Sequence, residues 1–238
     1  MKFVKFLSEI FSHRFRKKRK SRKRANVKPA LNDLDNLLVP YLDFENGFFI
    51  ECGANDGYSQ SNTYYLEKQK GWRGLLVEGI PELYEKCRIN RPRSIVKNCV
   101  LVSQDCSADT MTMHYCNLMS VVDGSMKSSD LQAEHLSTGF AVQKIDESYS
   151  VDVKAMTLES VLDSLEDMPK IDFFSLDVEG YELEVLKGLN LDKYRPAYIL
   201  VEARFYDEIK SFMTVKYYQE IAKLTSHDYL FKDAMGQS

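Results

Sequence analysis

One stretch near the start of the chain constrains the fold more than any other: residues 47–57, which read GFFIECGANDG. An apolar run leads through Glu51 into two glycines, Gly53 and Gly57, and a polar, helix-compatible segment follows. Such a run is typical of a buried strand that breaks into a turn before a helix, and in α/β sheets ligands bind at these strand ends. Glycine lets the backbone turn tightly and lets a ligand approach it closely. The stretch therefore predicts an α/β fold with a ligand site at this turn.

The residues of the turn exclude two common nucleotide sites. No Gly-Lys-Ser/Thr follows it, so it is not a phosphate-binding Walker loop. Asn55 stands where the dinucleotide motif GxGxxG has its second glycine, so a pyrophosphate would lack its close approach to the backbone. An acid before the turn suits a ligand that carries an amine or a ribose. An ordinary strand-to-helix turn is the alternative.

Alternating strand and helix signals follow along the chain. The next apolar run, Leu75 to Val77, ends in Glu78, and the 27 residues between Glu51 and Glu78 fit one βαβ unit. Strands are expected over 47–52, 75–77, 94–102, 149–156, 171–176, 197–201 and 229–232, and helices over 31–38, 61–69, 81–90, 158–165, 181–187 and 215–224. This alternation predicts a doubly wound, mostly parallel sheet.

Four of the expected strands end in acids. These are Glu51, Glu78, Asp177 (with Glu179 two residues on) and Glu202. In a parallel sheet the carboxyl ends of the strands meet at one edge, so these carboxylates should gather around one crevice. Such a cluster suits a cationic or polyhydroxyl ligand, or a divalent metal.

Residues 105–150 interrupt the alternation before the fourth parallel strand. They are rich in Ser, Asp and Met and contain Gly124 and Gly139. We expect a hairpin around residues 111–116 with a mobile stretch after it. An insertion this long at the carboxyl side of a sheet is a lid or a substrate loop if it is functional, and surface decoration otherwise. Ser120 is a candidate substrate-loop residue.

The N-terminus differs in composition from the rest. Residues 1–24 hold 11 of the 32 Lys and Arg residues and one acid, Glu9, so the remainder carries 21 basic and 34 acidic residues. Aromatic and leucine side chains recur every fourth residue from Phe3 to Phe15. A basic amphipathic helix at an anionic membrane surface fits this pattern, and a solvated tail fits it equally well. We expect an arm over residues 1–28 and one domain over 29–238.

The rest of the composition narrows the class of protein. An acidic body is a poor nucleic-acid binder, so any grip on phosphates would depend on the arm, and nucleic acid is an unlikely partner. The five cysteines form no CxxC pair and the four histidines show no metal-ligand spacing. We expect reduced thiols in a cytoplasmic protein, peripheral on the membrane if the arm binds there, and no zinc site.

Three ordered motifs resemble the FkbM family of S-adenosylmethionine-dependent methyltransferases. They are FIECGANDG at 49–57, VEGIP at 77–81, and LDVEGYE at 176–182 followed by VLKG at 185–188. The resemblance covers about residues 47–231 and implies a class I methyltransferase fold, S-adenosylmethionine as cofactor, and methylation of hydroxyl groups, often on sugars or polyketides. The expected acceptor is therefore a hydroxylated small molecule or a glycan.

The resemblance also implies roles for particular residues. The turn would hold the methionine part of the cofactor, and Glu78 would accept hydrogen bonds from the ribose hydroxyls. Asp177 and Glu179 would lie on the reaction side. There, together with Glu202, they would act as general base or hold Mg²⁺. Glu182 is expected to be partly structural. The residues assigned to the turn are Glu51, Gly53, Ala54, Asn55, Asp56 and Gly57.

Three questions stay open at this level. A cofactor-binding scaffold without activity, localised by its arm, is the alternative to an enzyme. Nucleic-acid methylation is disfavoured because the chain lacks an Asn-Pro-Pro-Tyr type motif. A complete fold of this kind closes with an antiparallel hairpin, and because the chain stops soon after residue 232, we expect the closing strand to be short, missing or supplied from elsewhere.

Overall fold

A computed structural model describes residues 27–144 and 148–236. The predicted arm, residues 1–24, lies outside the described residues, so the division of the chain at residue 28 stays a prediction. Among the described residues, no helix is long and apolar enough to cross a membrane.

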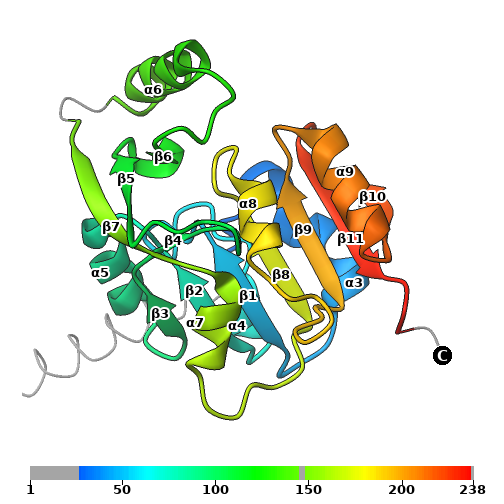
Figure 1. Cartoon of the computed structure of the whole chain (residues 1–238). Helices are drawn as coiled ribbons and strands as arrows, with labels where there is room; N and C mark the ends of the chain where they lie inside the picture. Colours follow the sequence, from blue (N-terminus) through cyan, green and yellow to red (C-terminus); the bar gives the residue numbers. More distant parts are fainter. Residues whose placement is uncertain (1–26, 145–147, 237–238) are drawn as a thin grey trace, which may run out of the picture.

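The described residues form a central seven-stranded sheet with the strand order β10-β11-β9-β8-β1-β2-β3 (Figure 1). β3, β2, β1, β8 and β9 run parallel, and β11 pairs antiparallel with both β9 and β10. The doubly wound, mostly parallel sheet is therefore confirmed. The strands are β1 (Phe48–Cys52), β2 (Arg73–Val77), β3 (Ile95–Lys97), β8 (Phe173–Leu176), β9 (Tyr198–Glu202), β10 (Tyr218–Lys223) and β11 (Asp228–Asp233).

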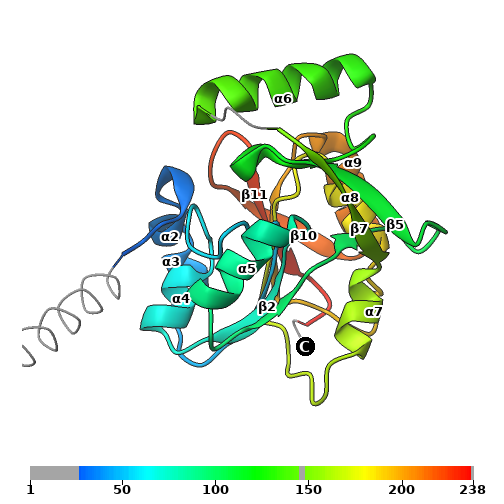
Figure 2. The same ribbon diagram turned by 90° about the vertical axis from the view of Figure 1, so that its left-hand side faces the viewer.

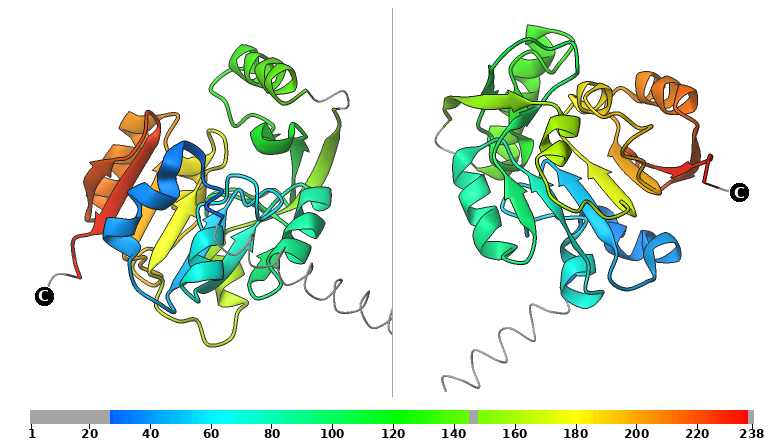
Figure 3. Two further views of the ribbon diagram at one scale, coloured as in Figure 1. Left: turned by 180° about the vertical axis from the view of Figure 1, so that it is seen from behind. Right: turned by 60° about the horizontal axis from the view of Figure 1, so that its bottom comes forward.

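Both faces of the central strands are buried. Successive side chains of a strand point to opposite faces, so neighbouring residues belong to different layers of the core. Ile50 and Phe174 pack on one face, and their neighbours Phe49 and Phe173 pack on the other. The first face is covered by α7 (Leu158–Asp163), α8 (Glu182–Lys187) and α9 (Tyr206–Val215). The second is covered by η1 (Leu31–Asp33), α2 (Leu34–Leu37), α3 (Val39–Leu42), α4 (Tyr64–Gln69) and α5 (Pro81–Asn90) (Figure 3).

The insertion forms a second, smaller sheet and a helix. The sheet has the order β4-β7-β5-β6, in which β5 pairs antiparallel with β6 and β7. Its elements are β4 (Val100–Leu101), β5 (Thr110–His114), η2 (Asn117–Met119), β6 (Val121–Val122), α6 (Ser129–Gln143) and β7 (Ser150–Met156). Figure 2 shows α6 lying across the top of the molecule, beyond the small sheet and above α8 and α9.

The stretch after the hairpin, which we expected to be mobile, is helical for most of its length, because α6 spans 15 residues. Ser128 begins this helix, since its hydroxyl accepts from the Leu131 backbone N–H at 3.2 Å. Glycine disfavours helix interiors, so Gly139 indicated a loop rather than a helix at this place in the sequence. A Cβ at Gly139 would lie 2.4 Å from the Cys116 sulfur, so glycine is what lets α6 pack closely on the loop before η2.

The C-terminal third contains a further error of prediction. The expected helix over 215–224 does not form: α9 ends at Val215, and residues 218–223 are strand β10. Tyr217 separates the two elements because its φ of +60° is incompatible with a continuing helix. β10 and β11 make the closing antiparallel hairpin, which the sequence had led us to expect short or missing.

The expected strand over 94–102 is divided between the two sheets. β3 extends the central sheet, whereas β4 pairs with β7. Asn98 lies at the break, where its side-chain amide donates to the carbonyls of Glu78 and Gly79 at 2.8 and 2.7 Å. These two bonds fix the backbone that follows β2.

Candidate active site

A cavity of about 610 Å³ lies at the carboxyl ends of β1, β2, β8 and β9. Its size is within the range of small-molecule and cofactor sites. Residues from the glycine turn, from η1 and α2, and from the insertion complete its lining. Among the described residues, seven lining side chains carry carboxyl groups, and Arg204 and His227 are the basic ones. The cavity therefore favours a cationic ligand, as a sulfonium with an α-amino group would be.

The glycine turn after β1 forms the floor of the cavity. Gly53 has a φ of +81°, and a Cβ there would lie 1.7 Å from the Asp177 carbonyl oxygen, so no other residue fits. The backbone N–H groups of Gly53 and Ala54 both donate to the Val77 carbonyl at 3.1 Å. The turn is thereby tied to the ends of both neighbouring strands.

Asp56 and Gly57 belong to the turn but do not line the cavity. The Asp56 carboxylate accepts from the backbone N–H groups of Tyr58 and Ser59 at 2.9 and 2.6 Å. Gly57 packs on α5, where a Cβ would lie 2.8 Å from the Cys87 sulfur. Both residues shape the turn, and neither is among the residues that line the cavity.

Glu51 lines the cavity, but protein groups already occupy its carboxylate. It accepts from the Ser61 hydroxyl at 3.0 Å, the Asn62 N–H at 3.0 Å and the Thr63 hydroxyl at 2.5 Å. The guanidinium of Arg91, which has no exposed side-chain surface, lies 3.4 Å away. Glu51 therefore holds the segment that leads into α4.

Arg91 is the centre of this buried network. It donates to Glu67 at 2.7 Å, to the Thr63 hydroxyl at 2.9 Å, to the Ser61 hydroxyl at 3.1 Å and to the Gly57 carbonyl at 3.2 Å. One cation from the end of α5 thus connects the glycine turn to α4. The sequence offers no motif that singles it out.

Glu78 lies directly after β2, and its two carboxylate oxygens contact the glycine turn and the backbone that follows β2. One accepts from the Asn55 N–H at 2.7 Å and the other from the Ile80 N–H at 2.8 Å. Burial raises its pKa to about 7, and the backbone hydrogen bonds limit that rise. Each oxygen keeps a lone pair, so the carboxylate can still accept from two hydroxyls of a bound ribose.

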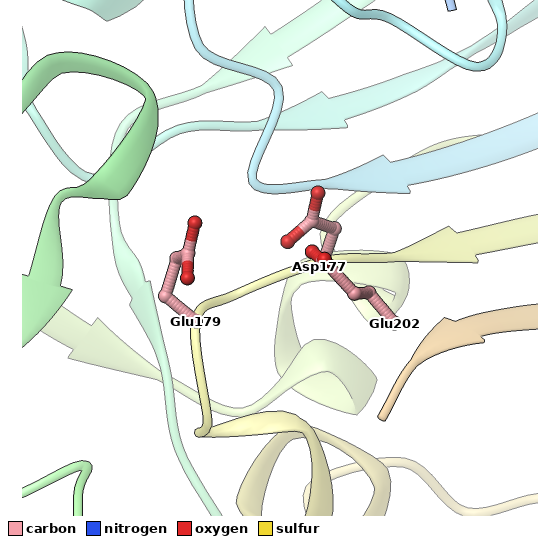
Figure 4. A group of neighbouring side chains, drawn as sticks. All are labelled: Asp177, Glu179 and Glu202. Atoms are coloured by element: carbon pink, nitrogen blue, oxygen red, sulfur yellow. The ribbon is translucent and has the colours of Figure 1, made fainter. Parts of the chain in front are cut away.

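The predicted carboxylate cluster forms at the ends of β8 and β9. Asp177, Glu179 and Glu202 each offer an oxygen within 4.8 Å of the others, and Figure 4 shows the three carboxyl groups gathered in one space. Glu179 adopts a left-handed conformation, with φ +55°, that is uncommon for a side-chain-bearing residue. The backbone of the loop after β8 is therefore strained at Glu179, the residue whose side chain joins the cluster.

Two carboxyl groups of the cluster, Asp177 and Glu179, have raised pKa values. Burial raises the pKa of Asp177 well above its ordinary value, and the neighbouring Glu202 carboxylate raises it further. Burial and Glu202 likewise raise the pKa of Glu179 to about 8, although Arg204 opposes the change. Raised pKa values of this kind are common where a carboxyl group takes up or donates a proton in a reaction.

Glu182 has a structural role, as the sequence indicated. One of its oxygens accepts from the N–H groups of Val178 and Gly180 at 3.3 and 2.8 Å. The carboxylate therefore closes the loop between β8 and α8. Burial raises its pKa to about 7.

The structure adds two residues that sequence reasoning missed, His135 of α6 and Arg204 after β9. His135 Nδ1 lies 3.0 Å from an Arg204 nitrogen, and Nε2 lies 3.0 Å from the Met119 carbonyl and 3.7 Å from Glu179. Arginine is only a donor, so Nδ1 accepts and Nε2 carries the proton. Burial lowers the pKa of His135, and Arg204 lowers it further, so the ring is neutral and orients Arg204 beside Glu179.

The insertion supplies the opposite wall of the cavity. Leu118, Met119, Ser120 and Val142 line it, and the Asn55 side-chain amide donates to Asn117 at 3.4 Å across the opening. The Ser120 hydroxyl accepts from the Cys116 N–H at 2.9 Å and donates to the Asn117 carbonyl at 2.7 Å. Ser120 therefore holds the loop of the insertion in place while it borders the cavity.

The cysteines show no sign of metal or disulfide chemistry. All five are unpaired, four of them are buried, and burial raises the pKa of the Cys87 and Cys99 thiols. That the thiols are reduced stays a prediction. The candidate metal ligands among the described residues are the three carboxylates of the β8–β9 cluster.

A mostly parallel sheet with a glycine turn after β1 and a buried acid after β2 is the cofactor-binding arrangement of class I S-adenosylmethionine-dependent methyltransferases. The family model described as "Methyltransferase FkbM domain" matches residues 51–231, and the chain belongs to this family. It is thus an S-adenosylmethionine-dependent methyltransferase by family, as the three motifs had indicated.

Three solved structures with which the chain was compared are distant likenesses. A TehB-like methyltransferase from Corynebacterium glutamicum has a TM-score of 0.45 and 10% identity, over 95% of this chain and 97% of the other. M. capricolum TrmK in complex with S-adenosylhomocysteine has a TM-score of 0.38 and 10% identity, over 83% and 67%. A precorrin-6y C5,15-methyltransferase from Geobacter metallireducens has 0.41 and 10%, over 85% and 92%. No curated protein matches the chain. The assignment rests on the family model.

Proposed function

We propose that the protein transfers a methyl group from S-adenosylmethionine to a hydroxyl of a sugar, a glycan or another polyhydroxylated acceptor. The observation that carries this proposal is the Asp177–Glu179–Glu202 cluster in the wall of the cavity. A hydroxyl is a weak nucleophile, so its proton must leave as the new bond forms. A raised pKa makes the carboxylate form a stronger base, so Asp177 or Glu179 can take up that proton once it is deprotonated.

In this proposal the cofactor supplies the methyl group on a positively charged sulfur, and the residues of the chain align and deprotonate the acceptor. The turn from Gly53 to Asn55 binds the methionine part of the cofactor, and Glu78 accepts hydrogen bonds from its ribose hydroxyls. Asp177 or Glu179 takes the hydroxyl proton. Alignment itself supplies a large share of the rate, up to roughly 7–11 kcal/mol in favourable cases.

The same three carboxylates could instead hold Mg²⁺, which would acidify the hydroxyl directly. Oxygen ligands suit Mg²⁺, and one atom from each residue lies within 4.8 Å of the others. The two versions differ in one measurement. If a carboxylate is the base, turnover survives a chelator; if Mg²⁺ is required, the chelator abolishes turnover and added Mg²⁺ restores it.

The test is methyl transfer from isotopically labelled S-adenosylmethionine to a panel of methyl glycosides and polyols, with the products analysed by mass spectrometry. The proposal predicts label in an acid-stable methyl ether on one class of acceptor. Label in protein, nucleic acid or amines alone would contradict it. Tight cofactor binding without transfer to any hydroxylated acceptor would favour a non-catalytic scaffold.

We further propose that residues 1–24 hold the protein at an anionic membrane surface. Eleven basic residues and an apolar stripe of spacing four support this proposal.

A further inference from the structure

Asn62 has a buried side-chain oxygen beside the cavity that makes no hydrogen bond within the described residues. It lies two residues before α4, is 9% exposed and borders the cavity. Its side-chain oxygen, Oδ1, has no hydrogen-bond partner among the described residues. Buried polar atoms are almost always paired, so an unpaired one at the wall of a cavity marks a place where a ligand can bind.

The rest of the Asn62 side chain is held in place. Its backbone N–H donates to Glu51 at 3.0 Å, and its side-chain Nδ2 donates to the Ser175 hydroxyl at 3.0 Å. Ser175 belongs to β8, is 2% exposed and borders the same cavity. Because Nδ2 is used by Ser175, what remains on Asn62 is an acceptor, and its partner must be a hydrogen-bond donor.

The charges around Asn62 favour a cationic donor. The buried carboxyl group of Glu51 contacts the Asn62 backbone, and Asp177 and Glu202 line the same cavity. The nearby cation, Arg91, is fully buried and already donates to Glu67, Thr63, Ser61 and Gly57. Carboxyl groups outnumber the two basic side chains, Arg204 and His227, in the lining of this cavity, so an ammonium group is favoured over an anion beside Asn62.

We propose that Asn62 Oδ1, supported by Ser175, binds the α-amino group of the methionine part of the cofactor. Asn62 directly follows Ser61, which Arg91 and Glu51 tie to the glycine turn, so the amide is fixed relative to the cofactor floor. The inference rests on the family's cofactor and is independent of the acceptor. It makes Asn62 a residue that distinguishes a complete cofactor from its adenosine half.

One competing explanation can be read from the structure. Asn62 also borders a second void, of about 10 Å³, between Asp35 and the helices α3 and α4. A void of that size holds one water at most. If Oδ1 bonds such a water, the amide has no role in ligand binding, and the experiment below separates the two explanations.

The experiment compares two ligands by calorimetric titration of the full chain at pH 8. S-adenosylhomocysteine carries the amino acid, and 5′-methylthioadenosine lacks it. We expect Asn62→Leu, which keeps the shape of the side chain, to weaken S-adenosylhomocysteine at least tenfold and to leave 5′-methylthioadenosine within twofold. The matched control is Glu78→Gln at the ribose side, which should weaken both ligands alike.

Three results would overturn the inference. Equal weakening of both ligands by Asn62→Leu would assign Asn62 a structural role, and no change in either ligand would assign Oδ1 to the water-sized void. Asn62→Asp should bind S-adenosylhomocysteine at least as tightly as the unaltered chain, because it adds an acceptor for the ammonium group. A tenfold loss in that variant would mean that Asn62 faces the carboxylate of the ligand instead.

A second variant keeps the inference testable if Asn62→Leu does not fold. Ser175→Ala removes the hydroxyl that holds the amide and leaves its oxygen in place. We expect a loss of at least threefold for S-adenosylhomocysteine, with 5′-methylthioadenosine unchanged. Equal losses for the two ligands would contradict the inference.

Discussion

Asp177 lies where β8 ends, and it lines the cavity beside Glu202. We predict that Asp177→Asn lowers kcat at least 100-fold, the range expected for loss of a general base, while S-adenosylhomocysteine still binds within a few-fold. The control is Asp172→Asn, near the opposite end of the same strand, where the carboxylate accepts from the Phe48 N–H at 2.9 Å. Full turnover in Asp177→Asn would exclude Asp177 as the base and as a required Mg²⁺ ligand, and would leave Glu179 as the candidate base.

Glu78 leads to a prediction for stability against pH. Burial raises its pKa in the folded chain to about 7, whereas an unfolded chain has the ordinary value of 4.5. Between those values the folded state binds more protons, so stability is greatest below pH 4.5 for this group and falls as pH rises to about 7. Glu182, with a pKa of about 7, has the same sign.

We therefore expect the melting temperature of the ligand-free protein to fall between pH 5 and pH 8. Glu78→Gln should show a smaller fall because it removes one of the groups responsible. Thermal unfolding followed by circular dichroism across that range provides the check. A melting temperature that rises with pH in the unaltered chain would show that the carboxyl groups are not buried as described.

At the residue scale, the sequence predicted the site where a motif exists. Gly53 and Glu78 were found because a turn after a strand and an acid after the next strand have fixed spacing. Asn62, His135 and Arg204 were missed because each takes its role from a partner distant in sequence: Ser175 for Asn62, and Arg204 for His135. No local pattern reports such a contact.

At the scale of elements, α5 offers a pair of arginines for a controlled comparison. Arg91 follows this helix and is fully buried between Glu67 and Glu51, whereas Arg88 pairs with Glu85 on the surface and is 54% exposed. We predict that Arg91→Met destabilises the fold by about 3–5 kcal/mol because it leaves the buried Glu51 without its cation and Glu67 with Lys68 alone.

Arg88→Met should cost less than about 1 kcal/mol, since exposed ion pairs contribute little. Urea unfolding of the two variants measures both changes. Similar small losses in both would mean that the Arg91 network does not hold the turn. Arg91→Met can also be tested for S-adenosylhomocysteine binding at temperatures where it remains folded. A loss of binding there would show that the Arg91 network supports the part of the glycine turn that binds the cofactor.

The elements that the sequence predicted poorly share a physical cause. Buried parallel strands can be recognised in a sequence as apolar runs, as at Phe48–Cys52 and Phe173–Leu176. β10 and α6 were missed because each depends on tertiary partners: β10 pairs with β11, and α6 packs through Gly139 on the segment before η2. Their local preferences are weak, so pairing and packing decide the structure.

At the scale of the whole molecule, charge is divided between residues 1–24 and the rest. We predict that the full chain co-sediments with vesicles rich in phosphatidylglycerol and that a chain without residues 1–24 does not. Each basic residue near an anionic surface contributes roughly 1 kcal/mol, and salt weakens the effect. Phosphatidylcholine vesicles are the control. Equal binding of both chains to anionic vesicles would refute a role for the arm.

The central claim is that this fold binds S-adenosylmethionine through the turn at Gly53 and the acid at Glu78. Calorimetric titration of S-adenosylhomocysteine into the full chain and into Glu78→Ala tests it most directly. We predict micromolar binding by the full chain and at least a tenfold loss in the variant. A full chain that is folded by circular dichroism yet binds no S-adenosylhomocysteine, or a variant that binds it equally well, would contradict the account.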